Sequence, residues 1–149
     1  MTQQTNDSNT EQLTTEKARK IVAPLYEALN RPAEKDTLAL LSQACHEDYK
    51  SYSTNENFLT RDVLAKVFKQ IGASVPDLTW TVKDLMVVGD RVIVRGEASG
   101  TPTAEFWGAK PTGKAFKTMA IDIFTIRDNK LAVAYHIENW IEALQQMKG

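Results

Sequence analysis

KAFKTMAIDIFTIR, residues 114–127, is the stretch that decides the fold. Its Ile, Phe and Thr residues predict a long β-strand, because β-branched and aromatic residues are enriched in strands. Asp122 lies in the most apolar part of this strand, where aspartate is depleted. A carboxylate buried there without a partner would be costly, or its pKa would rise until it was protonated. The chain must therefore either pair this acid or use it.

Apolar residues also recur at every second position, as is typical of strands, on both sides of this stretch. This pattern predicts further strands at Leu78–Val88, Arg91–Ser99 and Leu131–Glu138, with turns at residues 89–90 and 128–129 and a loop over residues 100–113. Helical spacing of apolar residues predicts helices from Thr14 or Thr15 to about Asn30, from about Glu34 to Ala44, from Thr60 to Gly72, and a short one at Trp140–Met147. Helices followed by an antiparallel meander indicate an α+β fold. We expect a cone-shaped barrel, in which a strongly curved antiparallel sheet wraps over the three N-terminal helices and encloses a cavity suited to a small molecule.

Composition excludes several classes of protein. The 149 residues carry a net charge of −1 from 18 basic and 19 acidic side chains, with no basic cluster for nucleic acid and no run of about 20 apolar residues for a membrane span. We expect a flexible tail over residues 1–13, a single domain over 14–149 and a cytoplasmic location, because the N-terminus lacks a signal-peptide pattern. The single cysteine, Cys45, is predicted to be a core residue. No metal site is expected, because His46 and His136 are far apart and lack ligand spacing.

Residues two apart in a strand share a face, and this rule places Asp122 among small and aromatic neighbours. Thr118, Ala120, Phe124 and Ile126 share its face, which suits the wall of a cavity. In one interpretation, burial raises the pKa of Asp122 toward neutrality and makes it a general base. In the other, Asp122 is structural and accepts hydrogen bonds from Arg95 or from a tyrosine across the sheet.

His136 is the second candidate for chemistry. It shares a face with Ala132, Ala134 and Glu138, and it would act as a general acid or hydrogen-bond donor, or serve a structural role. Phe106 and Trp107 form either a lid or an anchored loop. Aromatic residues are the predicted ligand contacts, since their polar ends could orient a carbonyl: Tyr49, Tyr52 and Trp107 in loops or at element ends, with Phe124 and Trp140.

Several segments together resemble one known family. They read GDRV at 89–92, RGE at 95–97, GTP at 100–102, FWGAKPTGK at 106–114, IDIF at 121–124, RDNKL at 127–131 and YHIENW at 135–140, continuing to Gln146. They resemble the SnoaL-like polyketide cyclase branch of the nuclear-transport-factor-2-like superfamily, which also includes proteins called ester cyclases. The resemblance covers about residues 15–149 and is specific in the second half.

This resemblance implies a cone holding an apolar ligand, in a homodimer or homotetramer packed through the outer face of the sheet. In the characterised cyclases, the acid at the position of Asp122 is the general acid/base of an intramolecular aldol ring closure, without metal or cofactor. Those enzymes place a histidine two residues earlier, where this chain has Ala120. His136 is therefore the candidate partner of Asp122.

Three hypotheses follow, from different classes. The first is an acid/base enzyme of the cyclase type, with Asp122 and His136 as catalytic residues. The second is a binding module that holds an apolar molecule without turnover. The third is a steroid-isomerase-like proton shuttle, which would need a second buried carboxyl group, such as Glu97 or Glu138 turned inward.

Overall fold

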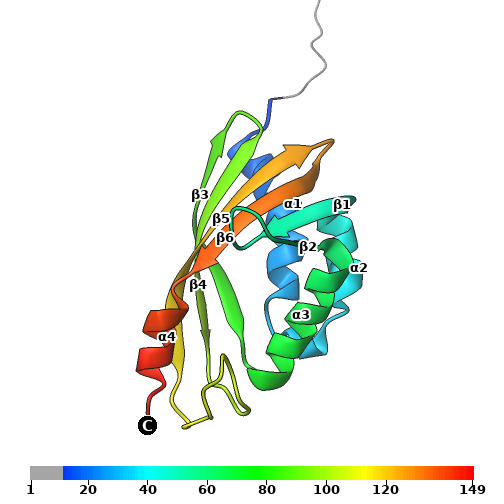
Figure 1. Ribbon diagram of the computed structural model, residues 1–149. Helices are drawn as coiled ribbons and strands as arrows, with labels where there is room; N and C mark the ends of the chain where they lie inside the picture. The colour runs from blue at the N-terminus through cyan, green and yellow to red at the C-terminus, as the bar shows by residue number, and fades with distance from the viewer. Residues whose placement is uncertain (1–11) are drawn as a thin grey trace, which may run out of the picture.

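The computed structural model describes residues 12–149. Apart from Gln12 and Leu13, the predicted flexible tail lies outside the described residues. Figure 1 shows the elements in chain order. They are α1 (Thr15–Ala28), η1 (Pro32–Glu34), α2 (Thr37–Ala44), β1 (Cys45–Tyr52), β2 (Phe58–Thr60), α3 (Arg61–Ser74), β3 (Thr79–Val88), β4 (Arg91–Gly100), β5 (Phe116–Arg127), β6 (Lys130–Glu138) and α4 (Trp140–Gln146).

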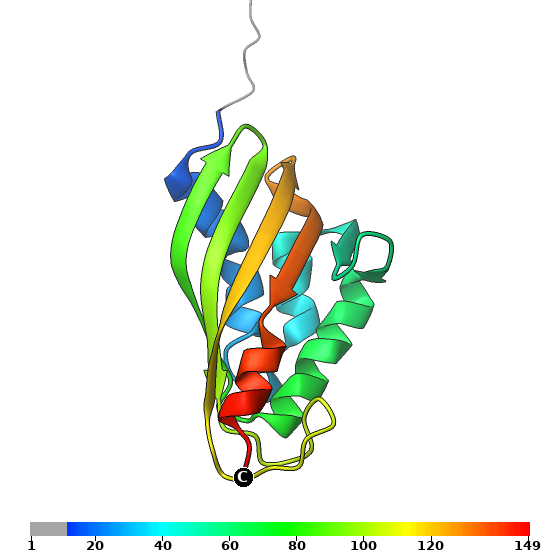
Figure 2. The ribbon, with the colours of Figure 1, turned by 60° about the vertical axis from the view of Figure 1, so that its left-hand side comes forward.

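The strands form one sheet in the order β2-β1-β6-β5-β4-β3. The sheet is open and curved, and α1, α2 and α3 cover its concave face, while α4 lies at one end of the sheet (Figures 1 and 2). The predicted α+β class and the curved sheet over three helices are confirmed. The predicted hairpins are also present, because β3 pairs with β4 and β5 pairs with β6 in antiparallel register.

Two strands, β1 and β2, were not predicted from the sequence. Residues 45–52, CHEDYKSY, are too polar to show a strand pattern, yet they form β1, which pairs in parallel with β6. Tyr49 therefore lies inside a strand, while Tyr52 is at the end of one, as predicted, and the sheet is mixed rather than wholly antiparallel. Pairing with a buried neighbour outweighs local propensity here. Cys45, at the start of β1, is completely buried as predicted.

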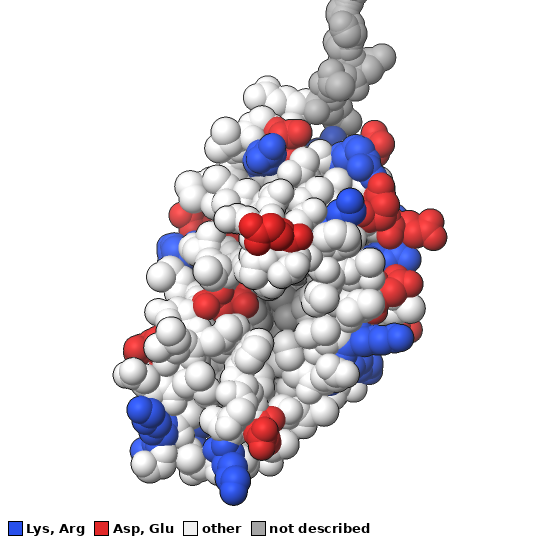
Figure 3. Space-filling model, in the orientation of Figure 1, with Lys and Arg blue, Asp and Glu red and all other residues white. Residues whose placement is uncertain are grey.

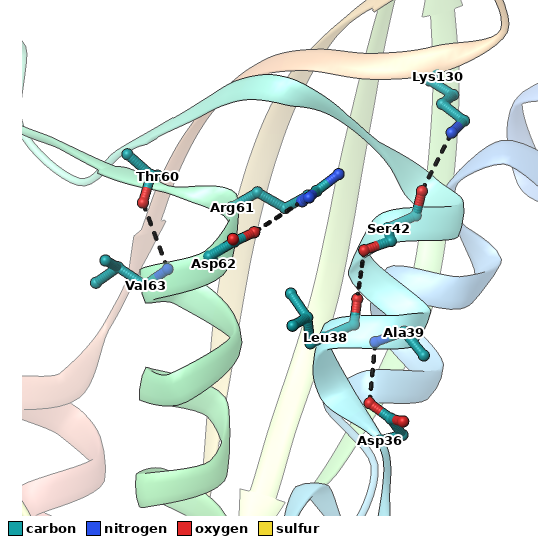
Figure 4. Close-up of polar contacts among 9 residues, drawn as sticks. All are labelled: Asp36, Leu38, Ala39, Ser42, Thr60, Arg61, Asp62, Val63 and Lys130. Atoms are coloured by element: carbon teal, nitrogen blue, oxygen red, sulfur yellow. Dashed lines mark hydrogen bonds and ion pairs between the residues drawn. The ribbon is translucent and has the colours of Figure 1, made fainter.

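Side-chain caps set the beginnings of α2 and α3 (Figure 4). Ala39 N–H donates to the Asp36 carboxylate at 3.0 Å, and Val63 N–H donates to the Thr60 hydroxyl at 3.4 Å. The helix predicted from Glu34 therefore begins at Thr37. Each such cap stabilises its helix by about 1 kcal/mol.

The end of α3 also differs from the prediction, because the helix continues past Gly72 to Ser74. A Cβ at Gly72 would lie 2.5 Å from the backbone nitrogen of Ala33. Glycine is thus needed for the close approach of α3 to η1, and it does not end the helix.

The two faces of β5 have different surroundings. Thr118, Ala120, Asp122 and Phe124 are buried against the helices, as parity predicts. The outer face is apolar but exposed in the single chain, with Met119 at 53% and Ile123 at 37%, and on β6 Ile137 at 67%. The expected homodimer or homotetramer would cover this face and stays a prediction. Within residues 12–149, every helix is too short or too polar to span a membrane.

The core can be tested on α2, which offers a matched pair of leucines. Leu41 is completely buried, whereas Leu38 on the same helix is 45% exposed. We expect Leu41→Ala to lower the free energy of unfolding by about 2–5 kcal/mol, as for other buried leucines. Leu38→Ala should change it by less than about 1 kcal/mol. Urea unfolding followed by circular dichroism measures both, and equal effects would contradict the described packing.

Candidate active site

A cavity of about 300 Å³ lies between the concave face of the sheet and the helices. Figure 3 shows a hollow near the centre of the face seen in Figure 1, with mostly uncharged residues around it. The helices supply an apolar wall, consisting of Leu25, Leu29, Leu64, Val67, Phe68 and Ile71. The strands supply the polar groups, which are Tyr49, Ser51, Asp122, His136 and Glu138, with Ser53 just after β1. The cavity therefore has an apolar side and a polar side.

Six of the seven predicted site residues lie in the wall of this cavity. They are Asp122, His136, Tyr49, Trp107, Phe124 and Trp140. Tyr52 is not among the lining residues: its ring stacks on Tyr135 at 5.0 Å and contacts Phe58. Tyr135 is 44% exposed, so this stack lies away from the cavity.

Asp122 is fixed by its strand and by one hydrogen bond from a helix. It is 7% exposed and lies opposite His136 on β6. The Tyr26 hydroxyl, from α1, donates to Asp122 Oδ2 at 2.6 Å. The structural interpretation expected a tyrosine across the sheet or Arg95, but Arg95 is exposed on the other face of β4. Within residues 12–149, Oδ1 has no hydrogen-bond donor, so this oxygen is available to a ligand in the cavity.

Burial dominates the electrostatics of Asp122. It raises the pKa of the carboxyl group from 3.8 to about 6, against the opposing effects of the Tyr26 hydrogen bond and of His136, and with a further contribution from the charge of Glu138. Burial and the neighbouring Asp122 likewise hold the pKa of Tyr26 well above 10. Tyr26 is therefore a permanent donor, and Asp122 exchanges its proton near neutral pH.

His136 is held by the residue two positions further along β6. Its Nδ1 lies 2.8 Å from Glu138 Oε2, and Trp140 Nε1 donates to Glu138 Oε1 at 3.1 Å. Burial by itself would lower the pKa of His136, but the hydrogen bond and charge of Glu138, together with the charge of Asp122, outweigh it and raise the pKa. The site thus contains a carboxyl group that can accept a proton beside an imidazole that can donate one.

Tyr26 was not predicted as a site residue, and Glu138 was predicted only as a possible second carboxyl group. Tyr26 follows Leu25 on the buried face of α1, and a tyrosine on an otherwise apolar helix face was a usable signal. Trp80 was also not predicted to line the cavity; it is 7% exposed, and its Nε1 has no acceptor among residues 12–149. All three tryptophans of the chain, Trp80, Trp107 and Trp140, line the cavity.

The loop between β4 and β5 brings aromatic rings to the cavity. Phe106 and Ala109 exchange two backbone hydrogen bonds around Trp107 and Gly108, whose φ angles are 51° and 77°. A positive φ is unfavourable for tryptophan, and ring packing offsets it. The Trp107 ring lies 5.7 Å from Trp140 and 5.9 Å from Phe106. Trp107 is 57% exposed and also lines the cavity, as a lid residue would.

Three polar side chains meet at the polar wall. One oxygen each of Asp122 and Glu138 and a ring nitrogen of His136 lie within 4.8 Å of one another. These residue types are found around divalent cations, and they are the described residues best placed to hold one. Hydrogen bonds from Tyr26 and Trp140 and between His136 and Glu138 account for their arrangement within the protein. The expectation of no metal site, which considered histidine spacing alone, stays a prediction.

The raised pKa of Asp122 predicts how stability depends on pH. Because the folded pKa lies above the unfolded value, the folded protein binds this proton more tightly, and stability is lost as pH rises from 3.8 to about 6. Asp122→Asn removes this titration. Between pH 4 and pH 8, we expect the free energy of unfolding of the wild type to fall by on the order of 2–3 kcal/mol more than that of this variant.

Urea unfolding across this pH range measures the effect. Asp48→Asn is the control, because the hydrogen bond from Arg127 lowers the pKa of that exposed carboxyl group, so any effect has the opposite sign. Parallel curves for wild type and Asp122→Asn would show that the pKa of Asp122 is not raised.

Comparison with known proteins places this geometry in a family. The model of the SnoaL-like polyketide cyclase family matches residues 22–147. No curated protein sequence matches the chain significantly. Among solved structures, TsrD from Streptomyces laurentii is 21% identical, with a TM-score of 0.77 over 91% of this chain and 97% of TsrD.

Two further structures are similar. IdmH from Streptomyces antibioticus, for which polyketide cyclase activity has been suggested, is 28% identical, with a TM-score of 0.73 over 85% of this chain and 95% of IdmH. AclR from Streptomyces galilaeus, suggested to be a hydroxylase, is 22% identical, with a TM-score of 0.75 over 90% of this chain and 97% of AclR. Given the family match over most of its length, the chain belongs to the SnoaL-like polyketide cyclase family.

Proposed function

We propose that this protein is an acid/base enzyme that binds an apolar carbonyl compound and moves a proton at the carbon next to the carbonyl, with Asp122 as the base. One observation carries the proposal: a buried carboxylate in the wall of the cavity has one oxygen held by Tyr26 and the other without a protein donor among residues 12–149. A carboxyl group with a pKa of about 6 is ionised at neutral pH and is a stronger base than an ordinary aspartate.

His136 would handle the oxygen of the carbonyl. When Asp122 takes the α-proton, the electron pair of the C–H bond moves into an enolate, and negative charge develops on the oxygen. The His136 imidazolium, whose pKa is raised, can donate a hydrogen bond or a proton to that oxygen. Base and acid are cross-strand neighbours, so a substrate can reach both.

The cyclase form of this reaction adds one bond. The enolate carbon attacks a second carbonyl carbon of the same molecule, a C–C bond forms, and the resulting alkoxide takes a proton from His136 or from protonated Asp122. No redox change occurs, and the residues present supply both proton transfers. The suggested activity of IdmH supports this form.

A second candidate is an isomerase-like proton shuttle. It needs a second inward carboxyl group, and the Glu138 side chain is only 11% exposed and lines the cavity. Glu97 does not fill this role, because its side chain is 32% exposed and lies near Lys83. In this form the base returns the proton to a different carbon of the same substrate, and no C–C bond is made.

The proposed proton transfer can be tested with a simple ketone. In D₂O the enzyme should catalyse exchange of the α-hydrogens of 1-tetralone, followed by proton NMR. Asp122→Asn should reduce this catalysis by about 10²–10⁴-fold, the usual contribution of a general base. Ketone binding should be nearly unchanged, and quenching of Trp80, Trp107 and Trp140 fluorescence measures it because all three line the cavity.

The control is Asp128→Asn, in the turn between β5 and β6, which should exchange at the wild-type rate. Equal rates for wild type and Asp122→Asn would contradict the proposal. Binding with no exchange in either protein would favour the binding module.

Tyr26→Phe separates the base from its donor. The Tyr26 hydrogen bond lowers the pKa of Asp122, so its loss should raise that pKa above about 6. The acidic limb of the exchange rate against pH should then move to higher pH, with a lower rate at pH 6. A profile that does not move would mean that Tyr26 has no influence on the base.

Two further parts of the proposal rest on other observations. We propose a homodimer or homotetramer built on the exposed apolar outer face of β5 and β6, on the basis of Met119, Ile123 and Ile137. Met119→Glu should reduce the mass measured by sedimentation equilibrium, and an unchanged mass would exclude this face. We propose the cytoplasm as the location on the sequence argument alone.

A further inference from the structure

We propose that Glu138 is a positioning residue: held by Trp140, it fixes His136 by Nδ1 and leaves Nε2 as the proton-bearing atom that faces the substrate. This inference rests on the proposed function, in which His136 is the acid. It concerns the segment HIENW, residues 136–140, of which the proposed reaction uses only the histidine.

The backbone places these side chains by fixing the junction between β6 and α4. His136 and Glu138 share the inner face of β6 by strand parity. Asn139 is the N-cap of α4, since its side chain accepts from Glu142 N–H, and its own N–H donates to Met119 O. The Thr118 hydroxyl donates to Asn139 O at 2.7 Å. β5 therefore holds the turn that directs Trp140 back toward Glu138.

The Glu138 carboxylate has a partner at each oxygen. Trp140 Nε1–H can only donate, so it occupies Oε1. Oε2 lies 2.8 Å from His136 Nδ1, and an ionised carboxylate only accepts, so Nδ1 must carry a hydrogen. A carboxylate that holds one ring nitrogen in this way sets the tautomer and orientation of the imidazole. The neutral ring then has a bare Nε2, and the imidazolium carries its transferable proton there.

Trp140 also connects this arrangement to the loop between β4 and β5. Its ring lies 5.7 Å from Trp107 and 5.4 Å from Phe106, while its N–H holds Glu138. The packing of the loop thus supports the group that orients His136. A strand histidine without Glu138 and Trp140 beside it would lack this support.

Among residues 12–149, two charged groups act on His136, Asp122 from β5 and Glu138 from β6. Tyr26 from α1 and Tyr49 from β1 interact with Asp122, and burial keeps the pKa of both tyrosines well above 10. The residues of α3 that line the cavity are apolar. Glu138 and Asp122 are therefore the two charges that keep the His136 proton in place against burial.

NMR of the histidine rings tests the proposal without a substrate. The chain has only two histidines, so His136 is followed beside His46, which serves as an internal reference. In wild type, the ¹⁵N shifts of the ring above its pKa should show the Nδ1–H tautomer. In Glu138→Gln, the proton affinity of His136 should fall by about tenfold or more, one pKa unit, because burial is then less opposed. The titrations contain EDTA, so that no divalent cation binds Asp122, His136 and Glu138 and changes the pKa of His136.

Two variants separate positioning from a general structural effect. Trp140→Phe keeps a ring against the loop but removes the N–H, and it should weaken the preference for the Nδ1–H tautomer. Glu97→Gln removes a carboxylate on the opposite face of the sheet and should leave both the pKa and the tautomer of His136 unchanged. An Nε2–H tautomer in wild type, or an unchanged His136 pKa in Glu138→Gln, would overturn the proposal. The wild-type tautomer decides the matter if Glu138→Gln fails to fold.

A failure of this inference can be distinguished from a failure of the proposed function. If His136 titrates as expected but Asp122→Asn still exchanges 1-tetralone at the wild-type rate, the reaction is wrong and the role of Glu138 stands. If exchange depends on Asp122 but His136 has the other tautomer, the role of Glu138 is wrong and the base stands.

Discussion

The hydrogen bond from Tyr26 to Asp122 is the interaction on which the rest of the site depends. It joins α1 to the central part of β5 at 2.6 Å, and it is the hydrogen bond that lets a buried carboxyl group remain in the wall of the cavity. Burial opposes the charge of Asp122, while Tyr26 offsets part of that cost. The balance leaves the carboxyl group poised between its two protonation states near neutral pH. A second protein donor would have favoured the charged form further and left a weaker base.

The remaining polar groups can be understood from the charge of the site. When the imidazole of His136 is protonated, its positive charge lies 2.8 Å from the carboxyl group of Glu138, and the charge of the site becomes more negative by one as Asp122 loses its proton. A neutral carbonyl compound can enter such a site with little electrostatic cost, and the enolate formed from it would meet the imidazolium. The apolar side chains of α1 and α3 would then contact the apolar part of the carbonyl compound. This division of the cavity suits a substrate with one polar edge and one apolar edge.

Local pattern was sufficient to predict some elements and not others. The strand over residues 114–127 and the hairpins on either side have clear alternation, and the side-chain caps at Thr14 and Thr60 are local signals; the structure contains all of them. β1 could not be predicted from CHEDYKSY, because its strand conformation depends on pairing with β6, which is about 80 residues away in the sequence.

The placement of Asp122 on an inner face followed from parity. Its partner did not, since Tyr26 is 96 residues away and nothing local links the two. Glu138 was named only as a possible second acid; that it holds His136 depends on the turn after β6.

The central claim is that Asp122 is a base whose pKa is raised by its cavity, and the rate of α-hydrogen exchange as a function of pH tests it most directly. With 1-tetralone as the probe, the wild-type rate constant should rise with pH along an acidic limb whose midpoint lies near 6, where burial places the pKa of Asp122, and it should fall again at higher pH as His136 loses the proton that it donates. Asp122→Asn should show no such limb. A midpoint near 3.8, the ordinary value of an aspartate, or the same profile in both proteins would contradict the account.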